Sequence, residues 1–489
     1  MSRVDELCGW TAVRLAQAIR AREVSCREVM AACLAQVERF NPQANAIVSL
    51  QPAEQLLARA DERDAQLARG ECMGWLHGFP QAPKDLADTA GIRSTHGSLI
   101  LQDHVPRTDA IVVERMRRAG AVFIGKTNTP EMGLGSHTYN RVFGTTRNAF
   151  DPRFSAGGSS GGAAVALALH MLPVADGSDM MGSLRNPAGW NHVFGFRPSF
   201  GRVPRGPAPD LFLSQLGTEG PMGRSVADVA MLLSVQAGFD DRAPLSLQDD
   251  PACFTASLDR SFEGTRIGWL GDLGGHLATE PGVLDTCTQA LRHLQALGCE
   301  VEAVPPPFDM ERLWRAWLTL RGALVAGAQA AWLADPAKRA LMKPEAVWEV
   351  ENGLRLTAAE VYQASVDRSA WYQALRGLFQ QFDFLVLPSA QVFPFDAQLH
   401  WPQRIDGREM DTYHRWMEVV VGGTMAGLPV LAVPAGFGGP HRLPIGLQLM
   451  GPARADLAVL QLGHAYEQAS GCGRVRSPLL TSDRTAGSC

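Results

Sequence analysis

The chain of 489 residues is 46% hydrophobic, a composition that agrees with a large enzyme. Its formal net charge of −5 indicates no basic face for binding a nucleic acid. No uninterrupted apolar run reaches the roughly 18 residues of a membrane span, and the N-terminus lacks the apolar segment of a signal peptide. We therefore expect a cytoplasmic protein with neither a nucleic-acid nor a membrane partner.

The first 70 residues are predicted to be an N-terminal helical segment. Ser25 and Glu28 have the spacing of a capping box, in which each side chain bonds the backbone N–H of the other residue. Apolar residues follow at helical spacing. Asn41 and Pro42 are predicted to end this helix.

From about residue 121, short apolar stretches alternate with helical runs, a pattern typical of an α/β sheet. We predict strands at residues 122–124, 172–175 and 383–388, and a helix at residues 163–169. Segment 75–235 contains most of the motifs that suggest chemistry. Between about residues 250 and 380 these motifs fade and helical patterns dominate. We interpret segment 250–380 as a variable helical cap, in which Thr357 and Glu360 begin one helix with a second capping box.

Residues 120–127 match the G-x-x-x-x-G-K-[ST] pattern of a nucleotide-binding P-loop. The interior of the match, Ala-Val-Phe-Ile, indicates a buried strand. Asn128, Thr129 and Pro130 then follow where a P-loop would begin a helix. The pattern therefore does not predict nucleotide binding.

Two glycine-rich turns and a lysine are the most informative features of the chain. Residues 157–162 read GGSSGG, residues 176–187 read DGSDMMGSLRNP, and Lys84 lies upstream. A serine in a glycine turn can expose its hydroxyl beside backbone N–H groups, as an acyl-transfer nucleophile requires. No Ser-His-Asp order accompanies these turns, so a buried neutral lysine is the physical alternative for the base. Taken alone, the first turn could also be a flexible loop or an anion cradle, and Lys84 a solvated surface charge.

Together with their neighbours, these residues resemble the amidase signature family. The family's GGSSGG run and its G-[ST]-D-x-x-G-S-[IL]-R-x-P segment match the two turns. Residues 75–85 (WLHGFPQAPKD) and 125–131 (GKTNTPE) are similar to two further motifs, and residues 383–388, 427–429 and 444–449 match its closing patterns. The resemblance implies a single amidase domain over residues 1–489, with an α/β fold in which helices cover both faces of a large mixed sheet.

The resemblance also implies a mechanism. Ser183 would attack an amide carbonyl and become acylated, while Ser159, joined to Gly158 by a cis peptide bond, would pass a proton between Ser183 and Lys84. Four backbone N–H groups are the implied oxyanion hole, those of Met180, Met181, Gly182 and Ser183.

Other residues are assigned supporting roles. Three are expected to hold the turns in place: Ser160, Asp179 and Arg185. Four are expected to bind substrate: Met132, Gly133, Leu134 and Gly158. The 12 histidines show no metal-ligand spacing and the nine cysteines include no C-x-x-C pair, so we predict no metal site. The implied mechanism requires no cofactor.

Met181 departs from the family pattern, which usually has glycine there. Its flexible apolar side chain either lines an acyl pocket, favouring apolar or aromatic acyl groups, or packs into the core. The sequence leaves both alternatives open.

The predicted function is hydrolysis of C–N bonds in small amides, with aryl amides, carbamates and esters as further substrate classes. The alternative is the glutaminase subunit of a tRNA-dependent amidotransferase. Those subunits usually carry Ser-Leu-Asp before a Gly-Pro, where this chain has Gln215, Leu216 and Gly217, which favours the stand-alone hydrolase. The partner is expected to be a small-molecule amide or ester, and a homodimer is left open.

Overall fold

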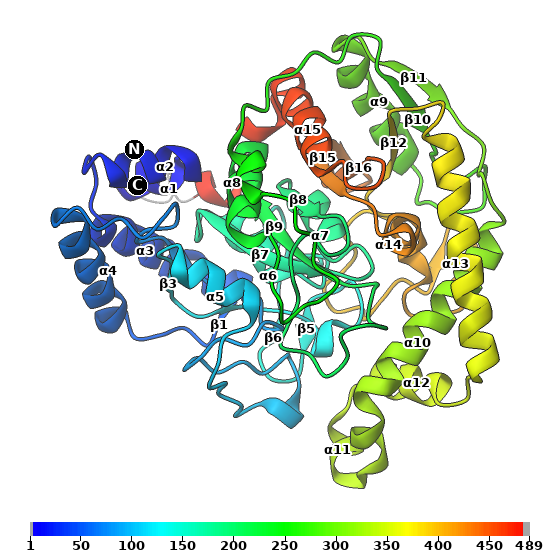
Figure 1. Cartoon of the computed structure of the whole chain (residues 1–489), viewed down its shortest axis with the longest axis horizontal. Helices are drawn as coiled ribbons and strands as arrows, with labels where there is room; N and C mark the ends of the chain where they lie inside the picture. The colour runs from blue at the N-terminus through cyan, green and yellow to red at the C-terminus, as the bar shows by residue number, and fades with distance from the viewer. Residues whose placement is uncertain (1–2, 483–489) are drawn as a thin grey trace.

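A mixed eight-stranded sheet forms the centre of the computed structural model, which describes residues 3–482 (Figure 1). The strand order is β11-β10-β12-β16-β15-β8-β9-β7. β10 is parallel to its neighbours β11 and β12, and every other adjacent pair is antiparallel. The strands are β7 (Val174–Asp179), β8 (Phe194–Arg197), β9 (Thr218–Gly223), β10 (Arg266–Trp269), β11 (Glu300–Ala303), β12 (Phe384–Pro388), β15 (Val430–Gly438) and β16 (Leu443–Met450).

Helices cover both faces of this sheet, as the sequence predicted. Successive side chains of a strand point to opposite faces. On β15, Val430 packs towards Gly423 of α14, and the next residue, Leu431, packs towards Gly463 of α15. All eight residues of β16 are buried, which explains its nearly continuous apolar sequence.

The helices around the sheet fall into two groups. Figure 1 shows α8, α15 and α9 beside one another on one side of the sheet. α7 and α14 pack with the opposite side. The bounds are α6 (Gly161–Ala168), α7 (Arg185–Trp190), α8 (Val226–Gln236), α9 (Val283–Ala296), α14 (Val421–Ala426) and α15 (Asp456–Ser470).

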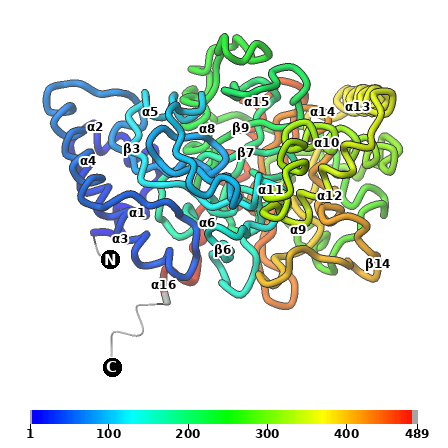
Figure 2. The backbone as a smooth tube through the Cα atoms, turned by 90° about the horizontal axis from the view of Figure 1, so that it is seen from below, coloured from blue at the N-terminus to red at the C-terminus, as the bar shows by residue number. Residues whose placement is uncertain are grey.

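Four helices begin the chain and lie at one end of the molecule (Figure 2). They are α1 (Arg3–Gly9), α2 (Ala12–Arg20), α3 (Cys26–Ala44) and α4 (Ala53–Ala68). The capping box of Ser25 and Glu28 is present at the start of α3. The predicted end at Asn41 and Pro42 is wrong, because α3 continues to Ala44. Pro42 lies in the last turn, and Asn45 ends the helix in a left-handed conformation with its N–H bonded to Asn41 O.

A layer of long helices lies at the other end (Figure 2). It comprises α10 (Met310–Ala334), α11 (Pro336–Leu341), α12 (Pro344–Gly353) and α13 (Ala358–Leu378), and the capping box of Thr357 and Glu360 begins α13. The prediction of a helical cap over residues 250–380 is wrong for its first part. There β10, α9 and β11 extend the central sheet, and the largely exposed edge strand β11 lacks an apolar sequence pattern. Within residues 3–482, no helix could span a membrane.

Short elements connect these layers. Four two-stranded pairs are formed by β1 (Ile47–Val48) with β4 (Lys126–Thr127), β2 (Pro80–Gln81) with β3 (Val122–Phe123), β5 (Tyr139–Asn140) with β6 (Gly144–Thr145), and β13 (Arg404–Ile405) with β14 (Arg408–Glu409). The remaining helices are α5 (Ile111–Arg118), α16 (Leu479–Ser482) and the 3₁₀ turns η1 (Leu99–Leu101), η2 (Glu131–Gly133), η3 (Pro251–Thr255), η4 (Arg415–Val420) and η5 (Cys472–Arg474).

The P-loop-like segment contains β3 and β4 and leads into no helix, as we inferred. Lys126 is fully buried, and its Nζ donates to Thr89 Oγ1 at 2.7 Å and to Ala87 O at 2.5 Å. The Lys126 amine is therefore hydrogen-bonded inside the fold and does not point to a phosphate-binding site.

The crossing of α10 and α12 depends on the absence of a side chain at Gly353. A β-carbon there would lie 2.1 Å from Gly322 O and 2.6 Å from Ala326 Cβ.

We expect Gly353→Ala to lower the free energy of unfolding by about 2 kcal/mol, because neither atom can move without shifting a helix. Gly377→Ala is the control. Gly377 lies in α13 with no atom near its β-position, so alanine should leave stability unchanged or raise it. Urea denaturation of both variants measures the difference, and equal stabilities would contradict the packing argument.

Candidate active site

The side chain of Lys84 ends in a cluster of serine oxygens. Its Nζ lies 2.8 Å from Ser159 Oγ, 2.9 Å from Ser160 Oγ and 3.0 Å from Ser178 Oγ. Lys84 is only 1% exposed. The two glycine-rich segments and the lysine, up to 94 positions apart in sequence, thus meet at one nitrogen atom. Ser178 is the one contact to which sequence reasoning had assigned no role.

Burial lowers the pKa of Lys84 to about 7, although the carboxylates of Glu219, Asp179 and Asp176 oppose this shift. The backbone N–H of Lys84 donates to Asp176 Oδ2 at 3.1 Å. Asp176 and Ser178 are two residues apart on β7, so their side chains reach the same face of the sheet. At neutral pH a substantial fraction of the Lys84 side chain is therefore the uncharged amine, which can accept a proton.

Asp179 points to the other face and holds the following turn. Its carboxylate accepts from the backbone N–H groups of Gly182 (2.9 Å) and Leu184 (3.1 Å). Arg185 donates to both carboxylate oxygens at 2.9 and 3.0 Å, and Arg197 to one at 3.1 Å. Burial opposes ionisation, but the two guanidinium groups hold the pKa of Asp179 well below its usual range. The expected supporting positions of Asp179 and Arg185 agree with this geometry.

Ser183 follows directly on this turn. Gly182 has φ +76°, the left-handed region that favours glycine, and a β-carbon there would meet Val420 at 2.8 Å. Ser160 N–H donates to Ser183 O at 3.2 Å, which ties the two serine segments together. The peptide bond between Gly158 and Ser159 is cis.

The predicted set of four oxyanion donors is wrong for one member. Gly182 N–H already donates to Asp179, because that carboxylate caps the turn. Within residues 3–482, the N–H groups of Met180, Met181 and Ser183 have no acceptor, so these three remain candidates.

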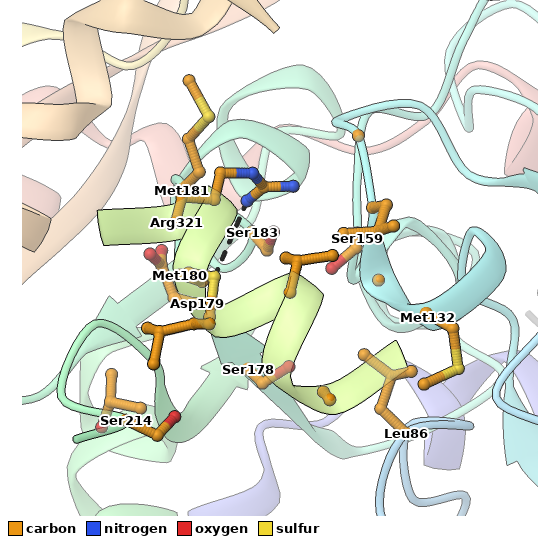
Figure 3. A pocket seen from close by; sticks show the side chains of 18 of the residues that line it. Leu86, Met132, Ser159, Ser178, Asp179, Met180, Met181, Ser183, Ser214 and Arg321 are labelled. Atoms are coloured by element: carbon orange, nitrogen blue, oxygen red, sulfur yellow. Dashed lines mark hydrogen bonds between the residues drawn. The ribbon is translucent and has the colours of Figure 1, made fainter. Parts of the chain in front are cut away.

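A cavity of about 200 Å³ opens beside Ser159 and Ser183 (Figure 3). Met132, Gly133 and Leu134, which we expect to bind substrate, belong to its lining. Gly158, which we also expected to bind substrate, is not part of the lining. It packs instead against the backbone of Ser136 and His137, which leave no room for a side chain.

The two methionines of the turn have different surroundings. Figure 3 shows Met180 Sδ joined to Arg321, whose NH1 donates to it at 3.6 Å. Met181 is 4% exposed and belongs to an apolar cluster with α10, α13 and α14. Its side chain is directed away from Ser183 in Figure 3. Met181 thus packs in this apolar cluster and also belongs to the cavity lining, as Met180 does, so both alternatives for its side chain stay open.

One face of α10 forms a wall of the cavity that sequence reasoning missed. Its residues recur at helical spacing: Arg321, Leu324, Val325, Ala328 and Gln329. No motif marks this segment, so only its placement in the fold brings it to the serines. Glu219 and Arg205 also line the cavity and were not predicted.

A mixed α/β fold thus holds a buried lysine among serine hydroxyl groups, beside a cavity. The family model described as Amidase matches residues 28–460. The chain therefore belongs to the amidase signature family and is a hydrolase acting on C–N bonds.

Individual relatives resemble almost the whole chain. It is 35% identical over 492 residues to a glutamyl-tRNA(Gln) amidotransferase subunit of Thermus thermophilus, covering 95% of this chain and 99% of that protein. It is 32% identical over 463 residues to an acylamidase of Rhodococcus erythropolis, covering 94% of each. The crystal structure of a bacterial aryl acylamidase superposes with a TM-score of 0.87 at 29% identity, covering 95% of this chain and 97% of that one.

The carboxylate of Asp179 is expected to be essential for stability. Asp179→Asn would leave the buried guanidinium groups of Arg185 and Arg197 without a counter-charge, a change that typically costs roughly 3–5 kcal/mol. The control is Asp151→Asn at the surface, where the partner Arg153 is 73% exposed and the loss should stay below about 1 kcal/mol. Denaturant unfolding of both variants tests this. A cost for Asp179→Asn no larger than that of the control would show that the cluster contributes little.

Proposed function

We propose that this protein is an amidohydrolase in which Ser183 forms an acyl-enzyme and Ser159 and Lys84 relay protons. The observation that supports this most directly is the 2.8 Å contact between Lys84 Nζ and Ser159 Oγ in a buried site. A neutral amine at this position can act as a base near pH 7.

The proposed reaction begins when Ser183 Oγ attacks the carbonyl carbon of the substrate and loses its proton to Ser159, whose own proton passes to Lys84. The negative charge on the carbonyl oxygen is stabilised by free backbone N–H groups of the Met180–Ser183 turn. Lys84 then returns the proton through Ser159 to the leaving nitrogen, and the C–N bond breaks. Water repeats the attack on the acyl-enzyme and releases the acid.

Ser160 and Ser178 have a positioning role in this proposal. Their hydroxyl oxygens lie 2.9 and 3.0 Å from Lys84 Nζ. They fix the nitrogen beside Ser159, and no carboxylate within residues 3–482 is in direct contact with it. This arrangement allows the amine to lose its proton more easily than an ion pair would.

The lining of the cavity supports amides with an apolar substituent as substrates. Leu86, Met132, Met180, Leu324 and Val325 contribute apolar side chains. The likeness to an acylamidase and to an aryl acylamidase points to the same substrate class. Carbamates and esters have the same carbonyl geometry and are further candidates.

A second candidate function is that of a glutaminase subunit, which the 35% identity to an amidotransferase subunit favours. The Gln215, Leu216 and Gly217 positions, where those subunits usually have Ser-Leu-Asp, favour the stand-alone hydrolase. Incubation of the purified protein with glutamine and with acyl anilides separates the two functions. Release of ammonia from glutamine, with no anilide cleaved, would establish the second.

We expect a fluorophosphonate probe to label Ser183. The reagent phosphonylates an activated serine, and Ser183 is the hydroxyl that follows the oxyanion turn. Peptide mass mapping should find one adduct on residue 183 and none after Ser183→Ala. An adduct on Ser159 or Ser160 instead would reverse the assigned roles.

Activity is expected to depend on the neutral form of Lys84. Its pKa of about 7 means that lowering the pH through 7 protonates the base, so kcat/KM should fall on the acidic side with an apparent pKa near 7. Lys84→Met should remove nearly all activity, whereas the exposed Lys338→Met is the matched control and should retain it. Initial rates from pH 5 to 9 test this. Retention of more than about a tenth of the rate by Lys84→Met would exclude the base role.

A further inference from the structure

Glu219 places a carboxylate on the catalytic side of the sheet. In the antiparallel pair of β7 and β9, Glu219 is directly opposite Ser178. Opposed residues of an antiparallel pair project to the same face. The Glu219 side chain therefore shares the face on which Ser178 Oγ contacts Lys84 Nζ, and it lines the cavity with Ser159 and Ser183.

The Glu219 carboxylate has few polar partners for a group so deeply buried. The Glu219 side chain is 13% exposed and accepts no hydrogen bond from any residue between 3 and 482. Its one ion pair in that part of the chain is with Arg205 Nε at 3.6 Å, and the Arg205 side chain is 52% exposed. Burial raises the pKa of Glu219, although Arg205 and Lys84 favour its charged form. Asp179, by contrast, is saturated by five donors.

Gln329 on α10 also belongs to the cavity lining. It is 4% exposed, and its Oε1 has no hydrogen-bond partner among the described residues and almost no accessible surface. The Glu219 carboxylate, by contrast, is partly exposed and accepts no hydrogen bond within residues 3–482. This carboxylate therefore favours a ligand that carries N–H donors.

The position of Arg205 shows how a substrate would reach Glu219. The catalytic cavity adjoins a second cavity of about 410 Å³. The two share a wall that includes Arg205, Gly217 and Thr218. Arg205 donates no hydrogen bond within residues 3–482 and is half-exposed, so its side chain can move aside for a substrate group at low cost.

We propose that Glu219 is a specificity residue that accepts a hydrogen bond from an amino group of the substrate, which makes amides carrying a second, primary amine the preferred substrates. The inference rests on the proposed amidohydrolase function. It assigns a recognition contact to a residue outside the Ser183, Ser159 and Lys84 relay.

The test compares substrates that differ only by an ammonium group in place of a methyl group. On the acyl side the pair is β-alanyl and butyryl p-nitroanilide. On the leaving-group side it is N-acetylethylenediamine and N-propylacetamide. Succinyl p-nitroanilide supplies an anionic acyl group of similar length. Wild type and Glu219→Gln are measured with all five, and Glu409→Gln, an exposed carboxylate paired with Arg404, is the control.

In at least one pair, the wild type should prefer the amine by about tenfold or more in kcat/KM, mainly through KM. Glu219→Gln should lose this preference and Glu409→Gln should keep it. Glu219 also faces Lys84, so Glu219→Gln should move the acidic limb of the pH profile to lower pH for every substrate. The ratio within a pair cancels this effect and isolates recognition.

Equal rates within both pairs for the wild type would overturn the proposal, as would a preference that survives Glu219→Gln. A preference for the succinyl substrate that disappears in Arg205→Met would assign the site to Arg205 and to anionic substrates instead. Cleavage of butyryl p-nitroanilide without an amine preference leaves the amidohydrolase function intact. If none of the five substrates is cleaved and the fluorophosphonate leaves Ser183 unlabelled, the proposed function itself has failed.

Discussion

The removal of the Lys84 amine from water is the constraint on which the site depends. An ammonium group at a surface would hold its proton far above neutral pH, whereas the buried position of Lys84 brings its pKa to about 7. The groups around the Lys84 amine agree with the same constraint. Hydroxyl oxygens of Ser159, Ser160 and Ser178 contact Nζ directly, and the carboxylates of Asp176 and Glu219 act on it without a direct ion pair. The lysine can therefore be both held in place and deprotonated.

A second buried charge cluster fixes the geometry around Ser183. Asp179 ends β7 and binds the N–H groups of the turn that presents Ser183, while Arg185 and Arg197 compensate its charge. Arg185 further donates to Val420 O, Thr424 Oγ1 and Gln448 Oε1, so the turn is linked to α14 and β16. The two clusters use opposite faces of one strand. Asp179 is held by its two guanidinium partners, while its charge still favours the protonated form of Lys84.

Part of the cavity lining comes from elements outside the motifs of the sequence. The wall formed by α10 belongs to a helical layer more than a hundred residues downstream of Ser183, and it adds the guanidinium of Arg321 and the amide of Gln329 to the cavity. The Arg321 charge is balanced by Glu349 at 2.5 Å, and its NH2 donates a hydrogen bond to the Tyr413 hydroxyl at 2.8 Å. Glu219 lacks so close a partner, since its ion pair with Arg205 spans 3.6 Å. The cavity is thus lined both by residues of the central sheet and by residues of the helical layer.

The motifs of the sequence were enough to predict the family and the α/β class by resemblance. The helix starts at Ser25 and Thr357 could be predicted because a capping box is a local pattern. The same motifs marked Lys84, Ser159 and Ser183 as candidates, and the fold brings these residues to one site. The sequence pattern placed the end of α3 too early, because a proline in the last turn of a helix does little to disrupt it. The pattern also missed strands β10 and β11, whose short sequences are not strongly apolar. Only the tertiary structure decided that Gly182 N–H donates to Asp179, that Met181 both packs in an apolar cluster and lines the cavity, and that Glu219, Arg205 and α10 belong to that lining. These outcomes depend on strand register and helix packing between segments distant in sequence, and no local pattern of residues records such contacts.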